Sequence, residues 1–132
     1  MKAARLLLLF CVLAFAPQCA WAAQFSGEYL ISVCDSDENG KELIPGSHIA
    51  CQAYISGIMD YHNLIRSLGT APSVDFCVPE DVPLNVLQNR VTYYLKQNRK
   101  VHAKFTAAPA VALALFEMYP CEGASVKVRK PK

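Results

Sequence analysis

Residues 47–69 read SHIACQAYISGIMDYHNLIRSLG and make up the longest helix-like segment of the chain. Apolar residues recur in it at steps of three to five, which predicts an amphipathic helix that is buried on one broad face. The apolar positions are Ile49, Tyr54, Ile58, Tyr61, Ile65 and Leu68. Ser47 is a suitable N-cap and Gly69 a suitable end, so we predict a helix over residues 48–68.

Two shorter helices are predicted on either side of this one. Ser26 suits the N-cap of a helix that ends at Cys34, and Pro83 suits the first turn of a helix that runs to about Asn98. Residues 35–46 are predicted to form a loop, because polar residues, glycine and proline dominate them.

A fourth helix is predicted over about residues 102–119, which are rich in alanine and leucine. An interior proline removes a helical hydrogen bond, so the helix either bends at Pro109 or starts near Thr106. No segment alternates polar and apolar residues over a useful length. The predicted fold class is therefore all-α, as a small four-helix up-and-down bundle.

The N-terminus has the three parts of a secretory signal. Lys2 and Arg5 precede an apolar run over residues 6–16, and the triplet AWA at residues 20–22 fits a cleavage site. We therefore expect residues 1–22 to be a cleaved signal peptide and the mature chain to lie in the periplasm. A membrane span needs roughly 20 apolar residues, and no segment reaches this length, so no integral membrane segment is expected after cleavage.

The rest of the chain is expected to form a helical domain over residues 23–121, followed by a basic, flexible tail over residues 122–132. Residues 23–126 carry 7 Lys and Arg against 11 Asp and Glu, and four basic residues follow them. A domain with this acidic balance is not expected to bind nucleic acid.

Four cysteines remain after removal of the signal: Cys34, Cys51, Cys77 and Cys121. An even number in a small exported chain indicates disulfides and not a metal site. In an up-and-down bundle, Cys34 and Cys51 lie at one end and the other two at the opposite end, roughly 30 Å away. A disulfide needs Cα atoms within about 7 Å, so we predict the two disulfides Cys34–Cys51 and Cys77–Cys121.

No catalytic cluster is recognised in the sequence. His48, His62 and His102 fit no known enzyme motif, and we expect them on helix surfaces or at helix ends. Cys51 lies one turn from His48, but a cysteine in a disulfide is no nucleophile. The acidic loop lacks the distant glutamate of a calcium loop. We therefore expect no catalytic residue, no metal and no cofactor.

Three short motifs form a pattern that extends over most of the chain. They are CQAYISG at residues 51–57, FCVP at residues 76–79 and YPC at residues 119–121. With them the chain resembles the Rap/Tai immunity-protein family from about Tyr29 to Cys121. The resemblance implies a non-enzymatic periplasmic protein that binds and inhibits a peptidoglycan amidase effector of type VI secretion. It also implies a homodimer.

The loop after the first helix is the predicted contact surface for such a partner. It is long, acidic and closed by the predicted first disulfide, and a tethered loop loses less entropy on binding. Its predicted contact residues are Asp35, Asp37, Glu38, Asn39, Lys41 and Glu42. Two alternatives stay open: a periplasmic stress chaperone, and a free-standing secreted helical protein of unknown partner.

Overall fold

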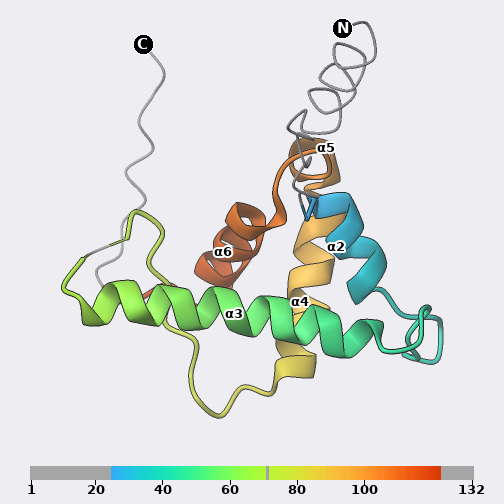
Figure 1. The fold of residues 1–132 in the computed structure, drawn as a ribbon, viewed down its shortest axis with the longest axis horizontal. Helices are drawn as coiled ribbons and strands as arrows, with labels where there is room; N and C mark the ends of the chain where they lie inside the picture. The colour runs from blue at the N-terminus through green and yellow to red at the C-terminus, as the bar shows by residue number, and fades with distance from the viewer. Residues whose placement is uncertain (1–24, 71, 123–132) are drawn as a thin grey trace, which may run out of the picture.

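The computed structural model describes residues 25–70 and 72–122. The predicted signal peptide, and the predicted tail beyond Glu122, lie outside these residues. Within them the helices are α2 (Gly27–Cys34), α3 (Ser47–Ser67), α4 (Leu84–Gln97), α5 (Arg99–His102) and α6 (Ala107–Met118) (Figure 1). This described part contains isolated β-bridges but no strand, which confirms the all-α class. None of these helices is long and apolar enough to cross a membrane.

The long helix α3 lies across α4 instead of running alongside it (Figure 1). Helices α2 and α6 pack against both of them. The predicted up-and-down order is therefore not confirmed. The apolar pattern of a helix indicates which face is buried but leaves the crossing angle open, and the loops over residues 35–46 and 68–83 are long enough to permit a crossing.

The core lies where these four helices meet. Its largest fully buried aliphatic side chains are Leu30, Ile55, Leu87, Val91, Leu95, Val111 and Leu115. Burial of side chains of this size contributes about 1.5–3 kcal/mol each to folding. Ala110 and Ala114 of α6 are buried as well, and their small side chains allow α6 to approach its neighbours closely.

Helix α3 is buried on a narrower face than its pattern predicts. Cys51, Ile55 and His62 are buried. Three apolar residues of the predicted face are exposed instead, and these are Ile49, Tyr61 and Leu68. The apolar pattern extends around more of the helix than α2, α4 and α6 cover. The exposed apolar residues of α3 are therefore available for contact with another molecule.

The start of α2 is hydrogen bonded to the turn before α6. Ser26 caps α2 as predicted, since its hydroxyl accepts a backbone N–H of the first turn. The N–H of Gly27 donates to the carbonyl of Phe105 at 2.9 Å, and that of Glu28 donates to the carbonyl of Ala103 at 3.0 Å. Two N–H groups that the start of a helix leaves unpaired are satisfied in this way.

Helix α6 starts at Ala107 with Thr106 at its N-cap, so Pro109 lies in its first turn. The N–H groups of a first turn have no partner within the helix, so a proline there costs no helical hydrogen bond. The predicted start near Thr106 is confirmed. The preceding residues form the separate one-turn helix α5, which the sequence pattern does not distinguish.

Two disulfides lie near the opposite ends of α3. Cys34, at the end of α2, is bonded to Cys51 near the start of α3, with Cα atoms 5.1 Å apart. Cys77, in the loop after α3, is bonded to Cys121 beyond α6, with Cα atoms 4.9 Å apart. These are the two pairs that the sequence predicts, and their separation along α3 is the reason that the prediction succeeds.

Gly27→Ala is expected to destabilise the protein by about 1–3 kcal/mol, because the added Cβ would overlap the backbone carbonyl of His102. Gly57→Ala is the matched control, since an added Cβ meets no atom within 4 Å there and alanine is the better helix former. Urea unfolding of both variants measures the difference. Equal stability of the two variants would contradict the close approach of α2 to α5.

Candidate functional site

The predicted contact loop between α2 and α3 contains a tight turn. The carboxylate of Asp37 accepts the N–H groups of Asn39 at 2.9 Å and Lys41 at 2.8 Å. The N–H of Asp37 also donates to the carbonyl of Lys41 at 2.9 Å. Gly40 adopts the left-handed conformation of this turn, with φ 76°. The carboxylate of Asp37 therefore stabilises the conformation of the loop.

Glu42 caps α3, a role that the sequence assigns to Ser47. Its carboxylate accepts the N–H groups of Gly46 at 2.9 Å and His48 at 3.2 Å. These backbone hydrogen bonds lower the pKa of Glu42 below its ordinary value. The predicted cap is wrong, because the chain turns at Gly46 (φ 79°) and Ser47 is already the first helical residue, without a capping bond.

Asp35 connects the loop to α4. Its carboxylate accepts hydrogen bonds from Lys96 Nζ at 2.6 Å and from the N–H of Ser36 at 2.9 Å. Burial acts to raise the pKa of Asp35, but these two bonds together with the charge of Lys96 lower it below its ordinary value. The loop is also attached to α3, since His48 Nε2 lies 3.2 Å from the Asp35 carbonyl oxygen.

Four of the six predicted contact residues are exposed, namely Asp37, Glu38, Asn39 and Lys41, while Asp35 and Glu42 are partly buried. The carboxylates of Asp35, Asp37 and Glu42 hold the shape of the loop or its attachment. Two neighbours, Leu43 and Ile44, are 56% and 51% exposed. We call Glu38, Asn39, Lys41, Leu43 and Ile44 the loop tip. Sequence reasoning missed the last two, although adjacent apolar residues in a polar loop are a usable signal of a contact surface.

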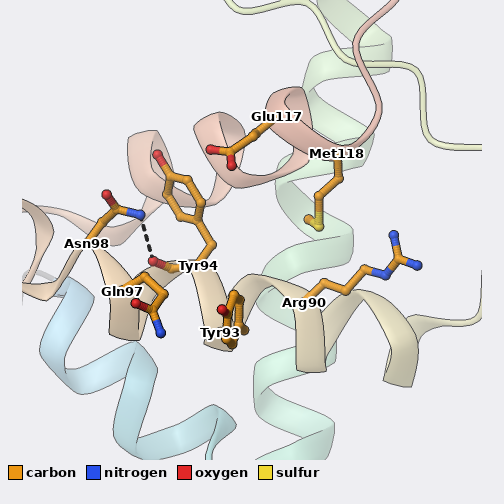
Figure 2. Close-up of a pocket in the computed structure, with 7 residues that line it drawn as sticks. All are labelled: Arg90, Tyr93, Tyr94, Gln97, Asn98, Glu117 and Met118. Atoms are coloured by element: carbon orange, nitrogen blue, oxygen red, sulfur yellow. Dashed lines mark hydrogen bonds between the residues drawn. The ribbon is translucent and has the colours of Figure 1, made fainter.

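A pocket of about 340 Å³ lies between α4 and α6 (Figure 2). It is lined by Arg90, Tyr93, Tyr94, Gln97, Asn98, Glu117 and Met118. Burial and the nearby carboxylate of Glu117 raise the pKa of Tyr94 above its ordinary value. The amide of Asn98 is occupied in a bond of 3.0 Å to the Tyr94 carbonyl.

An apolar groove of about 440 Å³ lies between α3, residues 72–76 and the start of α6. His62, predicted at a helix surface or end, lines this groove and is only 6% exposed. Its ring stacks on Phe76 at 3.8 Å, and its Nε2 lies 3.2 Å from a carboxylate oxygen of Asp75. The Cys77–Cys121 disulfide anchors the segment that covers His62, which explains why this histidine is buried.

The hydroxyl of Ser36 lies 3.1 Å from His48 Nε2. A hydrolytic triad also needs a carboxylate on the second ring nitrogen and donors for an oxyanion. The hydrogen bonds of the His48 ring within residues 25–70 and 72–122 go to Ser36 and to the Asp35 carbonyl, both through Nε2. They fasten the loop to α3. The same residues gather no three His, Cys, Asp or Glu side chains as a metal site would.

A small helical domain with two disulfides and an exposed, internally braced loop has the build expected of a small binding protein. Residues 26–121 match the family model of the Rap1a immunity proteins. The chain belongs to this family, and its partner is accordingly an effector protein. No curated protein and no solved structure matches the chain.

Glu42→Gln is expected to lower stability at neutral pH and to reduce the loss of stability in acid. Because the pKa of Glu42 is lowered in the folded state, its contribution is complete above the ordinary value of 4.5 and is lost as the pH falls through the lowered value. Glu38→Gln, in the same loop, is the matched control. Thermal unfolding as a function of pH measures both effects. A wild-type acid profile for Glu42→Gln would contradict the capping role.

Proposed function

We propose that the chain is exported to the periplasm and there binds and inhibits a peptidoglycan amidase effector delivered by type VI secretion. Membership of the Rap1a immunity proteins supports the inhibitory role. The two disulfides support an oxidising compartment, since disulfides are rare in the reducing cytosol. The observation that carries the proposal is the loop tip, an exposed surface on a loop of fixed shape.

The loop is held in shape from three directions. Asp37 and Glu42 each accept two backbone N–H groups within or beside it. Lys96 and His48 attach its start to α4 and α3, and the Cys34–Cys51 disulfide closes its base. Ordering a flexible side chain on binding costs about 0.5–1.5 kcal/mol. A loop that is ordered beforehand avoids much of this cost, which favours tight binding through a small surface.

The position of the loop suits the inhibition of a hydrolase. It projects beyond the helices at the start of α3 (Figure 1). Enzymes place their catalytic groups in concave sites, so a projecting loop has the shape to enter the site and exclude the substrate. Leu43 and Ile44 supply apolar contact area, while Glu38 and Lys41 supply charges of both signs that fix the orientation of the complex.

Exchange of the two tip charges, in the variant Glu38→Lys/Lys41→Glu, is expected to weaken amidase binding roughly tenfold or more. The matched control is Glu80→Lys/Lys100→Glu, which exchanges two exposed charges outside the loop. Both variants keep the net charge of the chain. Isothermal titration against the amidase, together with its turnover of peptidoglycan fragments, measures affinity and inhibition.

Two outcomes of this experiment would count against the proposal in different ways. Wild-type affinity in the tip variant would reject the contact surface but not the inhibitory role. A wild-type chain that binds no amidase and instead holds unfolded proteins in solution would reject the inhibitory role and favour the periplasmic stress chaperone.

We further propose that two copies of the chain pair through the exposed face of α3. Six exposed apolar or small residues recur along this face, and we call them the α3 stripe: Ile49, Ala53, Gly57, Tyr61, Leu64 and Leu68. None of these six residues is charged, and the stripe extends for roughly 28 Å, with the exposed Asp60 at its edge. Its small residues, Ala53 and Gly57, lie next to each other, with large residues on both sides of them. An antiparallel second copy, centred near Gly57, therefore places Tyr61 of one copy opposite Ala53 of the other, in a self-complementary two-fold contact.

Tyr61→Glu is expected to convert this dimer into a monomer, because the added charge would be buried without a partner at the interface. Tyr93→Glu is the matched control, since Tyr93 of α4 is similarly exposed, at 66% against 65% for Tyr61. Sedimentation velocity at micromolar concentration measures the oligomeric state. A monomeric wild-type chain, or a Tyr61→Glu variant that stays dimeric, would contradict the pairing through the α3 stripe.

A further inference from the structure

The two disulfides differ in their accessibility to solvent. Cys34 and Cys51 are 2% and 0% exposed and belong to the core. Cys77 is exposed in the loop after α3, while its partner Cys121 is 8% exposed. A thiolate breaks a disulfide by attacking one of its two sulfur atoms, so reduction depends on access to a sulfur. Of the four bonded cysteines, Cys77 is the exposed residue.

A cation lies beside the sulfur of this exposed cysteine. Arg66, near the end of α3, donates a hydrogen bond from Nη1 to Cys77 Sγ at 3.2 Å. The Nε of the same guanidinium lies 3.3 Å from the carboxylate of Asp75. Asp75 thus holds the guanidinium in place and leaves a second nitrogen directed to the disulfide. A positive charge next to a cysteine stabilises its thiolate form.

We propose that Cys77 is a site of thiol–disulfide exchange that reacts with the thiolate form of a small thiol. This reaction is separate from the binding of an effector. The incoming thiolate attacks Cys77 Sγ and forms a mixed disulfide with it. The Cys77–Cys121 bond breaks, and its electron pair leaves with Cys121, which takes a proton from water. A second thiolate then attacks the thiol-derived sulfur of the mixed disulfide, and Cys77 leaves as a thiolate. Two thiols are oxidised to one disulfide while the protein disulfide is reduced to two thiols.

Arg66 is a positioning residue for both steps. It attracts the incoming thiolate towards Cys77 in the first step and stabilises the leaving thiolate of Cys77 in the second. Cys121 stays nearby, because its N–H donates to the Asp75 carbonyl at 3.3 Å and the N–H of Cys77 donates to the Tyr119 carbonyl at 2.8 Å. These backbone bonds do not require the disulfide. Cys121 therefore remains in place to displace the bound thiol and re-form the Cys77–Cys121 disulfide.

The exchange site is remote from the loop tip. It lies beside Arg66 near the end of α3, whereas the loop tip precedes the start of this helix and is closed by the buried Cys34–Cys51 disulfide. Reduction at Cys77 removes the covalent anchor of the segment that covers His62 but leaves its backbone hydrogen bonds and the tethering of the loop unchanged. Loss of the Cys77–Cys121 bond is therefore expected to lower stability without a comparable loss of effector affinity.

The test treats the oxidised, exported wild-type chain with reduced glutathione, stops the reaction with acid and maps the modified cysteines by mass spectrometry. We expect glutathione to appear first on Cys77. We also expect Cys77–Cys121 to be reduced roughly tenfold or more faster than Cys34–Cys51, the internal control in the same molecule. Equal rates for the two disulfides, or glutathione that appears first on Cys121, would overturn the proposal.

The contribution of Arg66 is tested by the same assay. Arg66→Gln is expected to slow adduct formation roughly threefold or more, and Arg66→Lys to recover much of the rate because it keeps the charge. The difference between wild type and Arg66→Gln should shrink in high salt, which a purely structural role would not cause. Arg99→Gln, which removes a surface pair with Glu28, is the matched control. An unchanged or faster rate in Arg66→Gln would overturn the role of the guanidinium.

Discussion

The Cys34–Cys51 disulfide is the constraint on which the rest of the structure depends. It joins the last residue of α2 to the start of α3, and both of its cysteines lie in the core. The loop between them therefore begins and ends at fixed points, and the carboxylates of Asp37 and Glu42 are sufficient to order its backbone. An untethered polar loop would lose about 1–2 kcal/mol per residue on ordering, more than a few exposed hydrogen bonds provide.

The loop tip, the α3 stripe and the Cys77–Cys121 disulfide all lie along the axis of helix α3. Its buried face supplies Cys51, Ile55 and His62 to the domain, and the α3 stripe lies on its exposed face. The loop tip precedes its start, and the Cys77–Cys121 disulfide lies near its end. Contacts with an effector, with a second copy and with a thiol would thus occupy separate places. A change at one of these surfaces has a limited effect on the others, which makes them separable by mutation.

Local signals in the sequence predict the helices, and the length of α3 separates the cysteines into their two pairs. The cap at Ser26, the end of α2 at Cys34 and the start of α6 near Thr106 follow from propensities that act within a few residues. The crossing of α3 over α4 does not follow, because it depends on how distant side chains fit together. The apolar period of α3 wrongly assigns Tyr61 to the core, because a period cannot distinguish a packed apolar face from an exposed one.

The contact loop was predictable as a loop from its composition, but the roles of its side chains were not. Glu42 caps α3 only because the path of the backbone brings the Gly46 and His48 N–H groups to it. Hydrogen exchange of the loop amides tests most directly whether the loop is ordered before it binds. In the free chain the N–H groups of Asn39, Lys41 and His48 should exchange slowly, and the amidase should slow exchange further at the loop tip. Rapid exchange of these amides in the free chain, or protection by the amidase only elsewhere, would contradict a preordered inhibitory loop.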